Sequence, residues 1–432
     1  MSKAASAATG PMPPPGRDLR ADLRARLRAG LAWLWRWPAR SPRTGRLAAA
    51  PIFLLALVGI INYLQMASRY WHGTAPLNDF FALWAWSAMI HALAHPLAIY
   101  DPAQVQRFMR AAYAGFHGHY PFAYPPSFLL LIWPLGLMRR PVAYAVWVTL
   151  GVLAYLGAVA PGPWRRQAGV LVLFAPTTAV AIATGQDGLL MAALLIGGCR
   201  LLPRRPLLAG VLFGVLSFKP QFGLMVPLAL LAAGQWRTIA TAAATVLASV
   251  LASAAAFGWG MWERWFLALW GLSTYVGGRA RLFPLMPTVT ANLHLLGGGP
   301  LLRGVAQAAA MLLVGAGVWW CWRRHGTGGI SAAVLQVGAL LAAPYGFFYD
   351  LPLLTGAAVA VVRERVAADA SFNPMELLVL FGTGSLASLM LNMKDQVPWS
   401  GLVLPPLFAF IVLRAWRIAP AAAPAPGARP GA

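Results

Sequence analysis

The chain has 432 residues, of which 59% are hydrophobic and 10% are charged. A soluble protein carries about a quarter charged residues, so this composition excludes a soluble enzyme, a disordered chain and a disulfide scaffold, and its continuous apolar runs exclude a β-barrel. The net charge of +23 comes from short Arg clusters between apolar runs, where charges set membrane topology, and does not indicate nucleic-acid binding.

Residues 1–46 form the first predicted region, a basic cytoplasmic tail. Within it, 18–37 place Leu at every fourth position, with Arg beside that stripe and Trp after it, which is typical of an amphipathic helix on a membrane surface. Nine Arg residues before the first apolar run predict a cytoplasmic N-terminus. Residues 47–417 follow as the transmembrane domain, and the Ala/Pro-rich residues 418–432 form a disordered cytoplasmic tail.

The transmembrane domain contains apolar segments long enough to suggest crossings of a hydrocarbon core that needs about 20 residues each. We expect an all-α polytopic membrane protein with about twelve spans. The candidate segments are 47–66, 122–138, 141–160, 168–184, 187–202, 206–218, 220–233, 238–257, 301–322, 328–347, 350–362, 374–392 and 399–415.

The number of crossings must be even, because Arg414 and Arg417 also put the C-terminus inside. If one of the candidate segments between 122 and 184 does not cross the membrane, most of the later Arg clusters lie inside. The sequence leaves open which segment this is, and it leaves either Arg139 and Arg140 or Arg165 and Arg166 outside.

This topology predicts two long outer loops, about 67–121 and 258–300. Each contains a Trp-rich apolar stretch, DFFALWAWSAMIHAL in the first and WERWFLALWGLSTY in the second. Such stretches are expected to form helices at the membrane interface that roof a site.

Acidic residues at the outer ends of spans are the best candidates for chemistry, because charges near hydrocarbon are costly. Asp79 in PLNDFF has apolar neighbours that would raise its pKa towards that of a base, although it could simply cap a helix. Asp187 in ATGQDGLL could cap a turn between helices. Asp350 in PYGFFYD lies beside Tyr345 and Tyr349, which could be interfacial aromatics.

Three basic residues at the outer side are candidates for contact with a phosphate. Lys219 interrupts an apolar stretch at SFKPQ, where it could hold a phosphate or extend towards the interface. Arg279 and Arg281 in VGGRARLFP could bind a lipid phosphate or contact headgroups. The histidines show no spacing typical of a metal site.

An ordered series of motifs resembles glycosyltransferase family 87, polytopic enzymes of the GT-C fold. The resemblance extends over about 47–415, and its motifs are an Asp-Phe in the first outer loop, IYDPAQ, FAYPPSFLLLIWPLGLM, TGQDGLL, SFKPQFGLMVPLALLAAGQWR, FPLMPTVTANLHLLG and LLAAPYGFFYDLPLL.

The resemblance implies a hexosyltransferase that takes a sugar, usually mannose, from a polyprenyl-phosphate donor. It implies transfer with inversion to a lipid or glycan hydroxyl on the outer face, with no cofactor and no obligatory metal. Asp79 matches the family's catalytic base. The heavy use of Arg hints at a bacterial inner membrane, with the active site on the periplasmic face.

The chemistry of such a transfer suggests a role for each of the remaining candidate residues. A lipid-phosphate leaving group needs a cation rather than a general acid, which points to Lys219, Arg279 and Arg281. Contacts with the sugar or the acceptor are expected from Gln186, Asp187, Tyr349, Asp350 and Tyr124. A transporter or flippase of lipid-linked sugars is the alternative. The lack of an internal repeat and the outer position of the charges favour the enzyme.

Overall fold

The computed structural model describes residues 57–65, 68, 79–92, 95–113, 116, 118, 120–159, 169, 172–277, 280–367, 384–390 and 397–418. These residues are helical, with turns between the helices and no strand among them. Several predictions fall outside the described residues: both tails, the amphipathic helix at 18–37, Arg165 and Arg166, and Arg279.

Four described helices are long and apolar enough to cross a membrane, and each matches a predicted span. Their interior residues carry long runs of Ala, Leu and Val, and much of their surface faces outward, as lipid contact requires. They are α6 (Arg140–Val159), α13 (Trp236–Phe257), α16 (Pro300–His325) and α20 (Trp399–Arg417).

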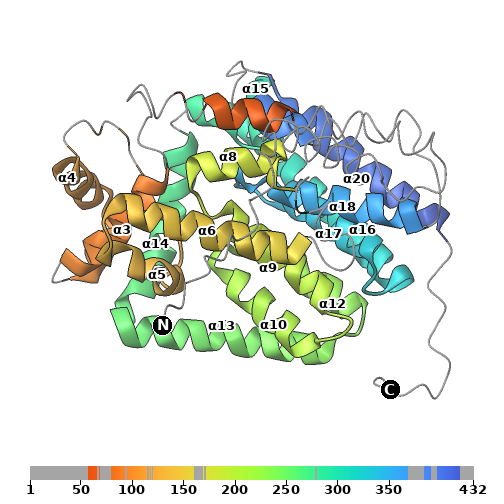
Figure 1. Cartoon of the computed structure of the whole chain (residues 1–432), viewed down its shortest axis with the longest axis horizontal. Coiled ribbons are helices and arrows are strands. Elements are labelled where there is room, and N and C mark those ends of the chain that lie inside the picture. Colours follow the sequence, from red (N-terminus) through yellow and green to blue (C-terminus); the bar gives the residue numbers. More distant parts are fainter. Residues whose placement is uncertain are drawn as a thin grey trace, which may run out of the picture.

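Shorter apolar helices fill the interior between these four. In Figure 1, α9 (Gly188–Leu201) and α17 (Gly329–Ala342) lie centrally, and almost every residue of both is buried. Helices α6 and α10 pack on α9, while α16 and α18 pack on α17. The other short helices of this inner layer are α8 (Pro176–Thr184), α10 (Pro206–Val215), η4 (Leu216–Phe218), α11 (Pro220–Gly223), α12 (Val226–Ala232), η6 (Phe348–Asp350) and α18 (Pro352–Ala367).

The segment 122–138 does not form a spanning helix. It folds as α5 (Ser127–Ile132) followed by η2 (Trp133–Leu137), which together rise about 19 Å, against the roughly 30 Å of a hydrocarbon core. The Ser87 hydroxyl donates to the carbonyl oxygens of Ile132 and Trp133, at 2.8 and 2.9 Å, and so fixes this segment to α3 (Phe80–Ala92). The run 168–184 also lacks a long described helix, since α8 (Pro176–Thr184) rises only about 14 Å.

Arg140 contacts two rings of the predicted first outer loop. Its guanidinium carbon lies 5.9 Å from the centroid of the Phe81 ring and 5.8 Å from that of Tyr113. Both rings belong to the predicted first outer loop, so the N-terminal end of α6 packs beside that loop.

The two predicted outer loops contain the expected helices and contact each other. The first holds α3, η1 (Pro96–Tyr100) and α4 (Pro102–Ala112), and the second holds α14 (Gly260–Gly277), η5 (Ala280–Leu285) and α15 (Val289–Leu295). Helix α14 packs on η1, and the Trp265 indole donates to the carbonyl oxygen of Ala123 at 3.2 Å. Asp101 caps α4 as its place before Pro102 predicts, because its side chain accepts from the N–H groups of Ala103 and Gln104.

Candidate functional site

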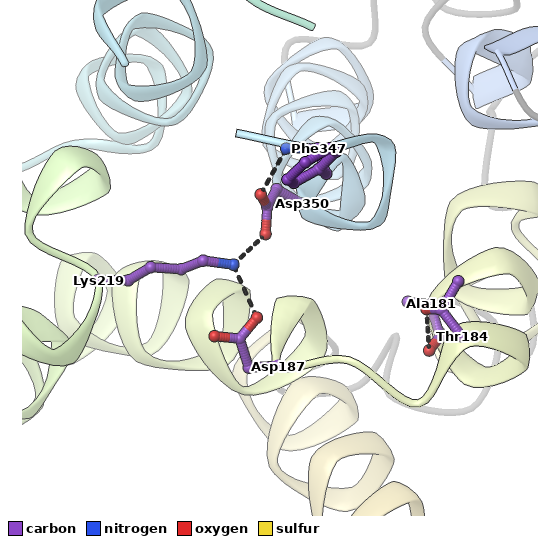
Figure 2. Close-up of polar contacts among 6 residues, drawn as sticks. All are labelled: Ala181, Thr184, Asp187, Lys219, Phe347 and Asp350. Carbon is purple, nitrogen blue, oxygen red and sulfur yellow. Dashed lines mark hydrogen bonds and ion pairs between the residues drawn. The ribbon is translucent and has the colours of Figure 1, made fainter. Parts of the chain in front are cut away.

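Three candidates from separate parts of the sequence form one buried ionic cluster. The Lys219 Nζ lies 2.7 Å from Asp187 Oδ1 and 2.6 Å from Asp350 Oδ1, as Figure 2 shows. Each of the two carboxylates is 0% exposed and Lys219 is 4% exposed. One cation therefore balances two carboxylates, and we call this group the ionic trio.

A glycine turn positions Asp187. Helix α8 ends at Gly185, whose φ of 63° lies in the left-handed region that glycine adopts without strain. Asp187 then occupies the position before α9, but its side chain makes no capping bond and extends to Lys219 instead. The prediction of a simple capped turn is therefore wrong for this carboxylate.

Gly188 lets the segment that carries Asp350 approach Asp187 closely enough to complete the cluster. A Cβ at this position would lie 1.8 Å from the carbonyl oxygen of Tyr349. The absence of a side chain thus lets α9 approach η6, which carries Asp350. A further bond orients that carboxylate, since the N–H of Phe347 donates to Asp350 Oδ2 at 3.0 Å.

Aromatic rings line the ionic trio. The Lys219 Nζ lies 5.1 Å from the centroid of the Tyr349 ring and 5.5 Å from that of Phe222. Tyr124 stacks on Phe128 with centroids 4.2 Å apart. Burial, followed by the negative charges of Asp187 and Asp350, raises the pKa of Tyr124 well above its usual value, so its hydroxyl stays a hydrogen-bond donor.

A buried oxygen beside the trio, Gln186 Oε1, lacks a hydrogen-bond partner among the described residues. The Tyr124 hydroxyl lies close enough to Asp187 to serve as a donor to that carboxylate. A buried acceptor without a donor costs free energy, so a hydroxyl group of another molecule that reached Gln186 Oε1 would be stabilised there. The trio also carries one net negative charge, which disfavours an anion. Lys219 is thus better suited to holding the two carboxylates than to the phosphate contact its sequence position predicts.

Asp79 lies at the start of α3 and forms a second polar centre. It is half-buried, and its Oδ1 accepts a hydrogen bond from the Tyr120 hydroxyl at 2.9 Å. Burial raises the pKa of the Asp79 carboxyl, and the bond from Tyr120 opposes part of that rise. Sequence reasoning missed Tyr120; the available signal was its place in the Tyr-rich run before FAYPP.

The two centres are joined by packing between Phe80 and the Gly185 turn. A Cβ at Gly185 would lie 2.7 Å from Phe80 Cβ, so the residue after Asp79 touches the turn that carries Asp187. Among the described residues, the Asp79 carboxylate hydrogen-bonds to Tyr120 and to no member of the ionic trio.

The remaining candidates divide between the trio and the surface. Tyr349 is buried against the trio, whereas Arg281 is exposed in η5 and, in the part of the chain that the structure describes, belongs to neither polar centre. Among the described residues, no group of three or more His, Cys, Asp or Glu side chains is placed to hold a metal ion.

Comparison with known proteins gives one match. A sequence model described as glycosyltransferase family 87 matches residues 122–344. The matched range contains Asp187 and Lys219, while Asp79 and Asp350 lie on either side of it. No curated protein and no solved structure matches the chain.

Proposed function

The chain belongs to glycosyltransferase family 87 and is a multi-pass membrane glycosyltransferase, and on this premise we propose the reaction that it catalyses. It moves a sugar, mannose in our proposal, from a polyprenyl-phosphate donor to a hydroxyl of a lipid or glycan. The site faces the periplasm of a bacterial inner membrane. The observation that carries the proposal is the half-buried Asp79, held by Tyr120 and attached through Phe80 to the turn beside the ionic trio.

Asp79 acts as the general base. Its carboxylate takes the proton of the acceptor hydroxyl while that oxygen forms a bond to the anomeric carbon. The bond from the anomeric carbon to the phosphate oxygen breaks on the opposite face, and its electron pair leaves with the polyprenyl phosphate. The anomeric centre is therefore inverted. A raised pKa makes the carboxylate a stronger base than an exposed Asp, and burial supplies that rise.

Hydroxyl groups of the sugar or acceptor bind beside the trio. The unpartnered oxygen of Gln186 accepts from them, and Asp187 and the Tyr124 hydroxyl exchange their contact with each other for contacts with the ligand. Asp350 and Tyr349 complete this surface. Lys219 contacts both carboxylates and so holds Asp187 and Asp350 close together. Arg279 and Arg281 remain candidates for contact with the donor's phosphate.

The test compares transfer of radiolabelled mannose from polyprenyl-phosphate mannose in membranes that contain wild type, Asp79→Asn or Asp101→Asn. Asp101 is a matched control, because it lies in the same outer loop but caps α4. We expect label in a lipid or glycan product with wild type and Asp101→Asn, and a loss of at least a hundredfold with Asp79→Asn.

Retained transfer by Asp79→Asn would exclude it as the base. If wild type transfers no mannose, the same assay with other polyprenyl-phosphate hexoses tests the donor. A wild type that moves lipid-linked sugars across liposome membranes without transferring them would favour the flippase.

A further inference from the structure

The proposed transfer needs a cation for the phosphate that leaves with the polyprenyl chain. Lys219 is a poor candidate, since it is 4% exposed and contacts two carboxylates. Arg140 has the opposite surroundings. It is partly exposed, and it has no carboxylate partner among the described residues.

Aromatic rings hold the Arg140 side chain in place. Its guanidinium carbon lies 5.9 Å from the Phe81 centroid and 5.8 Å from the Tyr113 centroid. Stacking on ring faces leaves the N–H groups at the edge of the guanidinium available, and it reduces the side-chain entropy lost when they bind an anion. The planar group can then make two parallel bonds to phosphate oxygens.

The packing of α6 against α3 puts this guanidinium beside the residues that follow the proposed base. Tyr144, one helical turn after Arg140, packs on Phe80 with ring centroids 5.3 Å apart. Arg140 and Tyr144 thus lie along Phe80 and Phe81, the two residues that follow Asp79 (Figure 1 shows α3 beside α6).

A second chain of contacts runs from Arg140 to the base through aromatic rings. Phe81 contacts Phe116 with centroids 5.2 Å apart, and Phe116 stacks on Tyr120 at 5.9 Å. Tyr120 in turn donates to Asp79. The cation and the base therefore border one aromatic cluster, which consists of Phe81, Tyr113, Phe116 and Tyr120.

We propose that Arg140 binds the phosphate of the lipid-linked donor and of the polyprenyl-phosphate product. The inference rests on the proposed function for the identity of the ligand. Arg140 stabilises the negative charge of the leaving phosphate. It lies across the aromatic cluster from Asp79. The polyprenyl chain lies in lipid beside the N-terminal end of α6.

The test measures binding of polyprenyl phosphate and of uncharged polyprenol to the full-length protein in detergent. The variants are Arg140→Gln, which removes the guanidinium and its charge but keeps a polar side chain, Arg140→Lys, and Arg139→Gln as a matched control. Arg139 is the adjacent arginine, is exposed, and makes no cation–π contact with the aromatic rings among the described residues. Thermal unfolding of each variant confirms that it is folded.

We expect Arg140→Gln to weaken binding of polyprenyl phosphate at least tenfold and to leave binding of polyprenol within twofold of wild type. Arg140→Lys should be intermediate, because it keeps the charge without the planar fork. Arg139→Gln should bind both lipids as wild type does.

Unchanged affinity in Arg140→Gln, or an equal loss in Arg139→Gln, would overturn the assignment and indicate general attraction to headgroups. Loss of phosphate binding in Arg140→Gln together with no sugar transfer by wild type would sustain the Arg140 site and reject the proposed function. Sugar transfer by wild type, together with unchanged binding of polyprenyl phosphate by Arg140→Gln, would support the proposed function and reject the Arg140 site.

Discussion

Replacing Lys219 by methionine removes the cation that lies between two buried carboxylates. Asp187 Oδ1 and Asp350 Oδ1 are no more than about 5.3 Å apart, because they lie 2.7 and 2.6 Å from the same Nζ. At an effective dielectric constant of about 20, two charges at that distance repel by roughly 3 kcal/mol. Breaking a buried ion pair costs about 3–5 kcal/mol in total, so we expect a lowered Tm of roughly 5 °C or more.

The two cysteines provide the assay. Cys199 and Cys321 are both buried and free, so a thiol-reactive fluorophore reports unfolding of the detergent-solubilised protein as temperature rises. Asp350→Asn leaves one carboxylate with one cation and should lower the Tm less than Lys219→Met does. Combined with Lys219→Met, Asp350→Asn removes the repulsion and should raise the Tm above that of Lys219→Met alone.

A Lys219→Met protein with the Tm of wild type would refute this reasoning. So would additive effects in the double variant, because they would show that the three charges do not act on one another.

Three further outcomes follow from single contacts. Tyr120→Phe removes the bond that lowers the Asp79 pKa, so kcat/KM should fall about tenfold, and the loss of rate as pH decreases should begin at a higher pH; an unchanged pH profile of transfer would contradict this. Gly188→Ala should sharply lower the yield of folded protein in size-exclusion chromatography, whereas Gly157→Ala, with nothing within 4 Å of the added Cβ, should not; similar yields would argue against the close approach. Asp101→Ala should cost about 1 kcal/mol and speed hydrogen exchange in α4 while transfer continues; unaltered exchange would show that the cap contributes little.

Sequence reasoning predicted much of the fold because lipid imposes a strong pattern. The two Trp-rich stretches became α3 and α14, and four of the predicted spans became α6, α13, α16 and α20. Hydropathy alone could not decide whether 122–138 crosses. There, proline and glycine shorten the helix, and the bonds from Ser87 that fix it come from a different segment.

The site was predictable residue by residue but not as an arrangement. Asp187, Lys219 and Asp350 each stood out because charges are scarce here, yet nothing local shows that one cation serves both carboxylates. Tyr120 and Arg140 were harder to select, because their significance comes from Asp79 and Phe81, which lie elsewhere in the sequence.

The chain positions of the ionic trio also bear on how the protein is made. Lys219 follows Asp187 by 32 residues, and Asp350 follows Lys219 by 131. At a synthesis rate of about 5–20 residues per second, Asp187 has its counter-ion available within roughly 2–6 seconds, and Asp350 arrives roughly 7–26 seconds after that. The Asp350 carboxylate is therefore synthesised at a time when Asp187 and Lys219 can already have formed a neutral ion pair. The reverse order, with both acids inserted before the amine, would present the membrane with two uncompensated charges during assembly.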